Sequence, residues 1–207
     1  LTYVENELSS YGFEVEVNKK DKKFESRIES AFVKAGTRIH LLKIGIKEGL
    51  LPYPSPLEKL KVKLEVDVNP PGGAEFTIKY HLRPLPFHVR LFTMPCLFAG
   101  KVHALLCRQW GGGRIKGRDL YDYLWFISRD IPLNLGYLGH LLAQSGKIDN
   151  PDELDHQLTL IMLKDKLSAI NYSQAKAEVT PFIKNPQELE LWSEHFFKTI
   201  TSDKLKT

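Results

Sequence analysis

Apolar and polar residues alternate along several short stretches in the first half of the chain. The clearest are residues 13 to 17, "FEVEV", and three later runs over residues 61 to 69, 74 to 80 and 86 to 92. Successive side chains of a strand point to opposite faces, so this pattern predicts strands. The sequences "NPPGG" and "RPLP" supply the turns between the last three.

Residues 25 to 36 leave two alternatives open. Ile28, Ala31 and Phe32 have helical spacing, and Gly36 would end the helix. The same segment could instead form a hairpin with residues 37 to 46, "TRIHLLKIGI". The three prolines of "LLPYPSPLEKL" then predict a loop or an extended crossing.

From Pro95 the apolar spacing becomes that of helices. The sequence predicts a helix that begins with Pro95, and another near the end in which Asn185 is the cap and Pro186 the first helical residue. The predicted helices cover residues 95 to 108, 119 to 128, 150 to 170 and 185 to 197. The chain is therefore expected to be α+β, with a boundary between residues 94 and 95.

Composition narrows the class of protein only a little. The 207 residues are 43% hydrophobic and 26% charged, with a formal net charge of +4, which permits an anionic partner without requiring one. No apolar run reaches the ~20 residues that span a membrane, and no signal peptide is visible, so we expect a cytoplasmic protein. Cys96 and Cys107 lie roughly 16 Å apart on the predicted helix, which favours free thiols.

The run from residue 61 to residue 69 has charged or polar residues at alternate positions. Lys63, Glu65, Asp67 and Asn69 are expected on one face of the strand. A solvated outer face is one interpretation. The other is a metal site, because parallel carboxylates on a rigid strand can share a hard cation such as Mg²⁺.

Two cations stand out on an otherwise apolar helix. Lys101 and Arg108 are seven residues apart, so they share a stripe of the helix with Leu97, Ala104 and Leu105. A buried cation requires an anionic partner, such as a carboxylate or a phosphate. The alternative is that both side chains reach solvent from a half-exposed stripe.

A basic, glycine-rich loop leads into the next predicted helix. It contains Gly111 to Gly113 and, with Arg108, the cations Arg114, Lys116 and Arg118. Its cations are suited to a nucleotide or an RNA backbone, although a solvated loop has the same composition. In the helix that follows, the spacing predicts an ion pair between Arg118 and Asp122.

Three of these features, taken in order, resemble the AbiEii/AbiGii toxin family of nucleotidyltransferases, in the DNA-polymerase-β-like superfamily. The first is K-x-D/E-x-x-x-N, the second L-x-x-x-K-x-x-A-L and the third R-D-x-x-D. They correspond to Lys63, Glu65 and Asn69; to Leu97, Lys101, Ala104 and Leu105; and to Arg118, Asp119 and Asp122. The fold this implies is a mixed or antiparallel nucleotidyltransferase-like sheet over residues 1 to 94, packed with a helical part over residues 95 to 207.

The resemblance implies a toxin of a type IV toxin-antitoxin or phage-exclusion system. Such a toxin transfers a nucleotide from a nucleoside triphosphate to an RNA or protein acceptor, in some members onto tRNA, and has a cognate antitoxin. Glu65 and Asp67 would be the carboxylates of a Mg²⁺ site, Lys101 would contact the triphosphate, and Asp119 or Asp122 would assist catalysis. The further nucleotide contacts expected from these motifs come from Lys63, Asn69, Arg108 and Arg118.

The family has one more motif, which precedes these three in sequence: a Gly-Ser or Gly-Gly pair followed by Asp-x-Asp. No Gly-Ser and no Asp-x-Asp occurs in the 207 residues. We expect this motif upstream of Leu1, or a truncated member. Without the motif, transferase activity is not expected from these residues alone. A non-catalytic module that binds nucleotide or RNA is the alternative function.

Overall fold

The computed structural model describes residues 13–19, 37–46, 60–67, 69–108 and 116–207, together with Asn6 and Ser10, which are helical. The chain divides into two compact units, residues 1–70 and 71–207, and each is described by itself. The two alternatives for residues 25 to 36 lie outside the described residues, as does the proline-containing stretch up to residue 59.

The first unit contains a three-stranded antiparallel sheet in the order β1-β2-β3. Its strands are β1 (Phe13–Lys19), β2 (Thr37–Ile46) and β3 (Leu60–Asp67). Glu65 is opposite Ile39, and Lys63 is opposite Leu41. The predicted strands are confirmed, but β3 ends at Asp67 and Asn69 lies in a bend beyond it. The expectation that Asn69 extends the polar row of the strand was therefore wrong.

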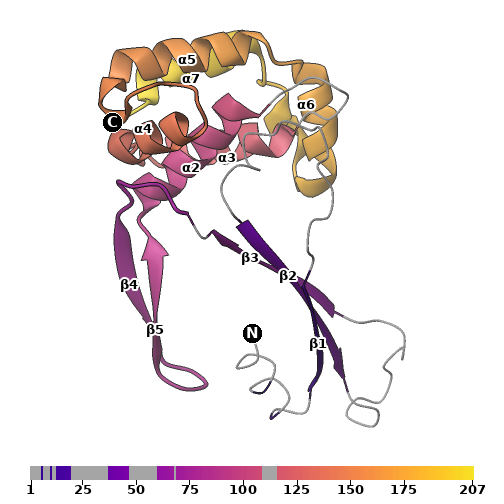
Figure 1. Cartoon of the computed structure of the whole chain (residues 1–207). Coiled ribbons are helices and arrows are strands. Elements are labelled where there is room, and N and C mark those ends of the chain that lie inside the picture. Colours follow the sequence, from indigo (N-terminus) through magenta and orange to yellow (C-terminus); the bar gives the residue numbers. More distant parts are fainter. Residues whose placement is uncertain are drawn as a thin grey trace. The chain divides into compact units, whose positions relative to one another are not determined.

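The second unit begins with a hairpin of β4 (Phe76–His81) and β5 (Phe87–Phe92). The strands are antiparallel, and Figure 1 shows them projecting from the helices of this unit. Two hydrogen bonds hold the base of the hairpin. The Thr93 N–H donates to the Glu75 carbonyl (3.0 Å), and the Glu75 N–H donates to the Cys96 sulfur (3.2 Å).

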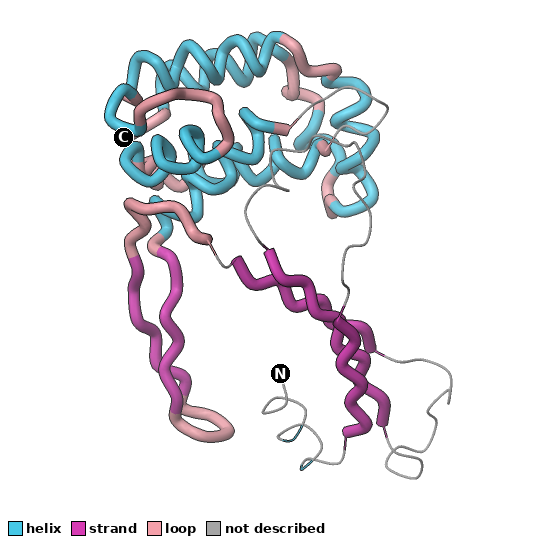
Figure 2. Tube along the Cα trace, viewed as in Figure 1, coloured by secondary structure: helices cyan, strands magenta, loops and turns pink. Residues whose placement is uncertain are grey.

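Six α-helices make up most of what the structure describes in the rest of the second unit (Figure 2). They are α2 (Met94–Cys107), α3 (Gly117–Ile127), α4 (Leu135–Gln144), α5 (His156–Ser168), α6 (Tyr172–Val179) and α7 (Glu194–Lys204). Helix α2 is central, because it packs against α3, α4 and α5, while α6 packs on α3 and α7 on α5. The predicted α+β class is confirmed.

Side-chain caps explain where four of these helices begin. Asn134, Asp155, Asn171 and Ser193 each accept a hydrogen bond from a backbone N–H in the first turn that follows. The core lies between the helices and includes Phe98, Val102, Leu120, Tyr123, Leu138, Leu163, Leu167 and Phe197. Cys96 and Cys107 are buried free thiols, as predicted.

The helix predicted over residues 185 to 197 is wrong. Asn185 does act as a cap, but of a short 3₁₀ turn over Pro186–Leu189, and α7 begins separately after Ser193. The interruption lets Trp192 enter the core, where it is 2% exposed and meets Phe197 edge to face at 5.4 Å. Burying the indole offsets the loss of a continuous helix.

Among the residues that the structure describes, none of the helices has the length and apolar character that a membrane crossing requires.

Candidate active site

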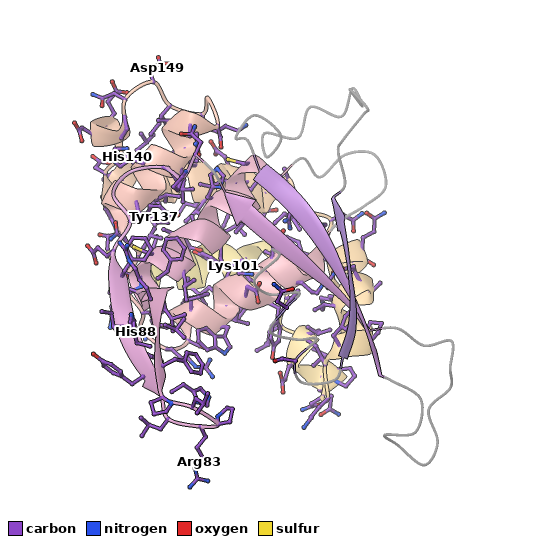
Figure 3. The ribbon with its side chains drawn as sticks, turned by 60° about the horizontal axis from the view of Figure 1, so that its bottom comes forward. Arg83, His88, Lys101, Tyr137, His140 and Asp149 are labelled. Carbon is purple, nitrogen blue, oxygen red and sulfur yellow. The ribbon has the colours of Figure 1, made fainter. Side chains whose placement is uncertain are left out.

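Lys101 and Asp122 form an ion pair between α2 and α3. The Lys101 Nζ lies 2.7 Å from the Asp122 Oδ2, and the side chains are 47% and 37% exposed. The amine therefore reaches solvent. Of the two alternatives for the cations of this apolar helix, Lys101 follows the one in which the side chain extends from a half-exposed stripe. Figure 3 shows Lys101 on α2. An exposed pair of this kind contributes roughly 0 to 1 kcal/mol to stability, so a ligand can replace either partner at little cost.

The exposed stripe of α2 is narrower than the sequence predicts. Leu97 and Lys101 are exposed, and Ala104 and Arg108 are half-buried, so these four form the stripe. Leu105, expected beside them, is fully buried in the core. The remaining face of α2 is buried because α3, α4 and α5 surround it.

Arg108 and Asp119 form a second, more buried ion pair between the same two helices. Asp119 is in the first turn of α3, and its side chain is only 10% exposed, against 30% for Arg108. Arg108 directly follows α2, and its N–H donates to the Ala104 carbonyl at 3.1 Å. A carboxylate at this depth requires a charged or hydrogen-bonded partner, and the guanidinium supplies both.

Arg118 does not pair with Asp122, so that prediction is wrong. Its Nε lies 3.3 Å from a carboxylate oxygen of Glu178 on α6, and its backbone N–H donates to the other oxygen at 3.2 Å. Glu178 thus lies at the amino end of α3, where a negative charge is favourable. Asp122 points to α2 instead and pairs with Lys101.

A glycine sets the position of the Arg118–Asp119 turn. A Cβ on Gly117 would lie 2.0 Å from the Ala175 carbonyl oxygen, so only glycine lets α3 approach α6 this closely. The glycine before "RD" therefore has a packing role that its place in a basic loop does not reveal. The loop's own Gly111 to Gly113 and Arg114 lie outside the described residues.

Lys166 on α5 joins this cluster and was not predicted. Its amine donates to the Arg108 carbonyl, at the point where α2 ends. Burial lowers the pKa of Lys166, as does the positive charge of Lys147, whereas Cys107 and Asp119 act in the opposite direction. Nothing in the local sequence "IMLKDKL" distinguishes Lys166 from Lys164, so only the tertiary structure identifies it.

Helix α2 also contributes a buried histidine. The His103 Nε2 lies 2.6 Å from the Ser145 hydroxyl, and the imidazole is 7% exposed. Burial lowers the pKa of His103 from 6.5 to about 4 and raises that of the nearby Cys107 thiol. The histidine is therefore neutral in the folded protein at pH 7.

We expect acid to destabilise the protein through His103. In the unfolded chain His103 binds a proton below pH 6.5, whereas in the folded chain it binds one only below about pH 4. The free energy of unfolding therefore decreases as the pH is lowered from 6.5 to 4. At pH 5 this loss is about 2 kcal/mol. Urea unfolding at pH 7.5 and pH 5 measures it, and His103→Gln should remove most of it. His195→Gln, an exposed histidine on α7, is the control, and an unchanged pH dependence in His103→Gln contradicts the prediction.

The motif residues Lys101, Asp119 and Asp122, and Arg108 from the stripe of α2, thus lie at the junction of α2 and α3. Residues 3–196 match the family described as nucleotidyl transferase AbiEii toxin of type IV toxin-antitoxin systems. The chain belongs to the AbiEii family. Searches among curated proteins and among solved structures found no match.

The AbiEii match covers both units, and the two ion pairs described above lie in the second. The first motif of the resemblance lies in the first unit, where Lys63, Glu65 and Asp67 are residues of β3. The structure does not place these three side chains, so their meeting with Lys101 stays a prediction.

The two motif carboxylates described in the second unit are each paired with a cation. Asp122 is engaged by Lys101 and Asp119 by Arg108. No group of three metal-binding side chains occurs among the described residues. The metal carboxylates predicted from the sequence, Glu65 and Asp67, occupy alternate positions of β3.

Proposed function

We propose that this protein in its full length transfers a nucleotide from a nucleoside triphosphate to an RNA acceptor, with Lys101 as its contact to the triphosphate. The observation that carries the proposal is the presence of two ion pairs, Lys101–Asp122 and Arg108–Asp119, between α2 and α3 in a chain of the AbiEii family. They bring the lysine motif and the Arg-Asp motif together at a partly exposed surface. This supports a shared role for the two motifs.

In the proposed reaction an acceptor hydroxyl attacks the α-phosphorus. The new phosphorus–oxygen bond forms as the bond from the α-phosphorus to the bridging oxygen breaks, and pyrophosphate leaves. Lys101 binds a triphosphate oxygen and neutralises charge that grows in the transition state. Asp122 orients the amine beforehand, and release of this exposed pair costs little.

Arg108 and Arg118 are the further proposed contacts to phosphate in the second unit. Each is already oriented by a carboxylate, Arg108 by Asp119 and Arg118 by Glu178. Preorganised cations need less reordering when phosphate binds. Lys63 and Asn69 are proposed to add contacts from the first unit.

Mg²⁺ is the proposed metal, held by Glu65 and Asp67, because carboxylate oxygens are the ligands that this hard cation prefers. When bound, it would activate the nucleophile and stabilise the pyrophosphate. We place the reaction in the cytoplasm and propose a cognate antitoxin as partner. We also propose residues 1–94 as the nucleotidyltransferase-like domain and residues 95–207 as the helical one.

Labelling tests this function. Full-length protein is incubated with Mg²⁺, total tRNA and each α-³²P-labelled triphosphate in turn, and labelled RNA is resolved on a gel. Lys101→Ala and Glu65→Ala should each reduce labelling by about tenfold to a hundredfold, because each loses a charge that stabilises the transition state. Lys184→Ala is the control, since Lys184 is exposed and far along the chain from the motifs.

Thermal unfolding of the same variants separates chemistry from folding. Lys101→Ala should unfold within about 1 kcal/mol of the parent, because its ion pair is exposed. Unchanged labelling in both Lys101→Ala and Glu65→Ala contradicts the proposal. Salt-sensitive binding of RNA with no labelling in the parent favours the non-catalytic binding module.

A further inference from the structure

The hairpin β4–β5 is exposed along its whole length. Every residue of β4 and of β5 is exposed, and so is the connecting turn. Figure 3 shows Arg83 at the tip, pointing away from the helices, and His88 on the strand. We call residues 76–92 the ribbon. Its contact with the helices is at the base, where Phe92 stacks on Tyr137 of α4 at 5.8 Å.

Aromatic rings follow both faces of the ribbon. Phe76 and Phe92 are opposite one another, with ring centroids 4.8 Å apart, and the Arg90 guanidinium lies 3.8 Å from the Phe76 centroid. Beyond them lies the cross-strand pair Tyr80–His88, at 6.3 Å. His81 and Phe87 stack at 5.3 Å on the opposite face. Tyr80 is 76% exposed, so most of its ring is open to solvent.

The charges of the ribbon have one sign, because from Phe76 to Arg118 there is no Asp and no Glu. This stretch has eight basic residues, Lys79, Arg83, Arg90, Lys101, Arg108, Arg114, Lys116 and Arg118. Of these, Lys101, Arg108 and Arg118 pair with carboxylates that follow the stretch in sequence. The rest of the chain has more acidic than basic residues, although the whole chain is +4. The first three of the eight basic residues are on the ribbon. The ribbon therefore lacks the carboxylates that would repel a polyanion.

We propose that the ribbon binds single-stranded RNA, through stacking of bases on its rings and contact of phosphates with Lys79, Arg83 and Arg90. This rests on the proposed function, in which RNA is the acceptor. An aromatic ring open to solvent, as that of Tyr80 is, with cations nearby is the combination that binds single strands without regard to sequence. A protein partner would account for the exposed Ile78 and Leu82, but it gives no reason for the complete lack of acidic residues. The charge therefore decides in favour of RNA.

Fluorescence anisotropy of the full chain tests the ribbon. The probe is a fluorescein-labelled, unstructured 12-nucleotide RNA, titrated at several KCl concentrations without triphosphate or Mg²⁺. Tyr80→Ala should weaken binding by about tenfold, the loss of one stacked base. Lys79→Ala with Arg83→Ala should weaken it and reduce the slope of log K against log salt by about 1.4, or about 0.7 for each lost phosphate contact.

Two exposed positions outside the ribbon are the matched controls. Lys184→Ala removes a surface charge and Leu191→Ala an apolar side chain that is 66% exposed, and neither should change RNA binding. The proposal is wrong if the ribbon variants bind as the parent does, or if Lys184→Ala weakens binding as much as Lys79→Ala. It is also wrong if Tyr80→Ala instead changes the sedimentation coefficient with RNA affinity intact, because the ribbon's partner is then a protein.

The two proposals fail separately. If labelling depends on Lys101 while the ribbon variants bind RNA normally, the ribbon inference fails and the transferase stands. If the parent labels nothing while RNA binding depends on Tyr80, the transferase fails and the ribbon inference stands.

Discussion

Asp119→Ala is expected to lower the free energy of unfolding by about 2 to 4 kcal/mol and to abolish nucleotide transfer. The Asp119 side chain is only 10% exposed and pairs with Arg108, so its removal leaves a half-buried guanidinium without its carboxylate. The Lys166 amine, already disfavoured in its charged form by burial and by Lys147, loses a stabilising negative charge as well. The end of α2 and the start of α3 should loosen together.

Asp122→Ala is the matched control for this prediction. Asp122 is on the same helix and also pairs with a cation from α2, but its side chain is 37% exposed. Asp122→Ala should lower the free energy of unfolding by less than about 1 kcal/mol, because water solvates the Lys101 amine once its carboxylate is removed. Urea unfolding at pH 7.5 measures both variants. Equal stability losses would mean that the burial of the Arg108–Asp119 pair has no energetic consequence.

A double variant tests whether the pair itself matters or only the unmatched charge. Arg108→Met with Asp119→Leu removes both charges and keeps apolar volume, so it should recover much of the stability lost in Asp119→Ala. Transfer activity should not recover, because the proposed contacts of Arg108 with phosphate are lost. Recovery of both stability and activity would show that neither charge takes part in the reaction.

The sequence identified the residues of this junction but not how they pair. Lys101, Asp119 and Asp122 are recognisable from motif spacing and Arg108 from its place seven residues after Lys101, and α2 and α3 bring them together. Arg118 was assigned to Asp122 because local helical spacing allows it, yet its partner is Glu178, sixty residues away. Such contacts depend on how α6 packs on α3, which no local pattern contains.

Helices α4 and α6 were missing from the prediction, and for α4 the physical reason is visible. Helix α4 has glycines at positions 136 and 139, which lower helix propensity. Its stability comes from packing, since a Cβ on Gly139 would lie 2.5 Å from the Pro151 carbonyl oxygen and Leu138 and Leu142 are fully buried. The strands were predictable because alternation is a local signal, whereas close backbone contacts are not.

Gly117→Ala is expected to lower the free energy of unfolding by about 2 to 4 kcal/mol. The added methyl group would lie 2.0 Å from the Ala175 carbonyl oxygen and 3.2 Å from the Ala175 Cα. Both neighbours are backbone atoms, so no rotamer change relieves the clash, and α3 must move away from α6. That movement also weakens the contacts of Arg118 with Glu178, which join the same two helices.

Thermal unfolding measures this effect, with a decrease of about 5 to 15 °C expected for a chain of this size. Gly100→Ala is the control, because Gly100 lies inside α2 and a Cβ there meets no atom within 4 Å. That variant should be neutral or more stable by up to about 1 kcal/mol, since alanine favours the helix. Opposite signs from the same substitution would show that Gly117 is required for the approach of α3 to α6. A Gly117→Ala protein as stable as the parent would mean that the two helices separate without cost, and the Arg118–Asp119 turn would then have no fixed position.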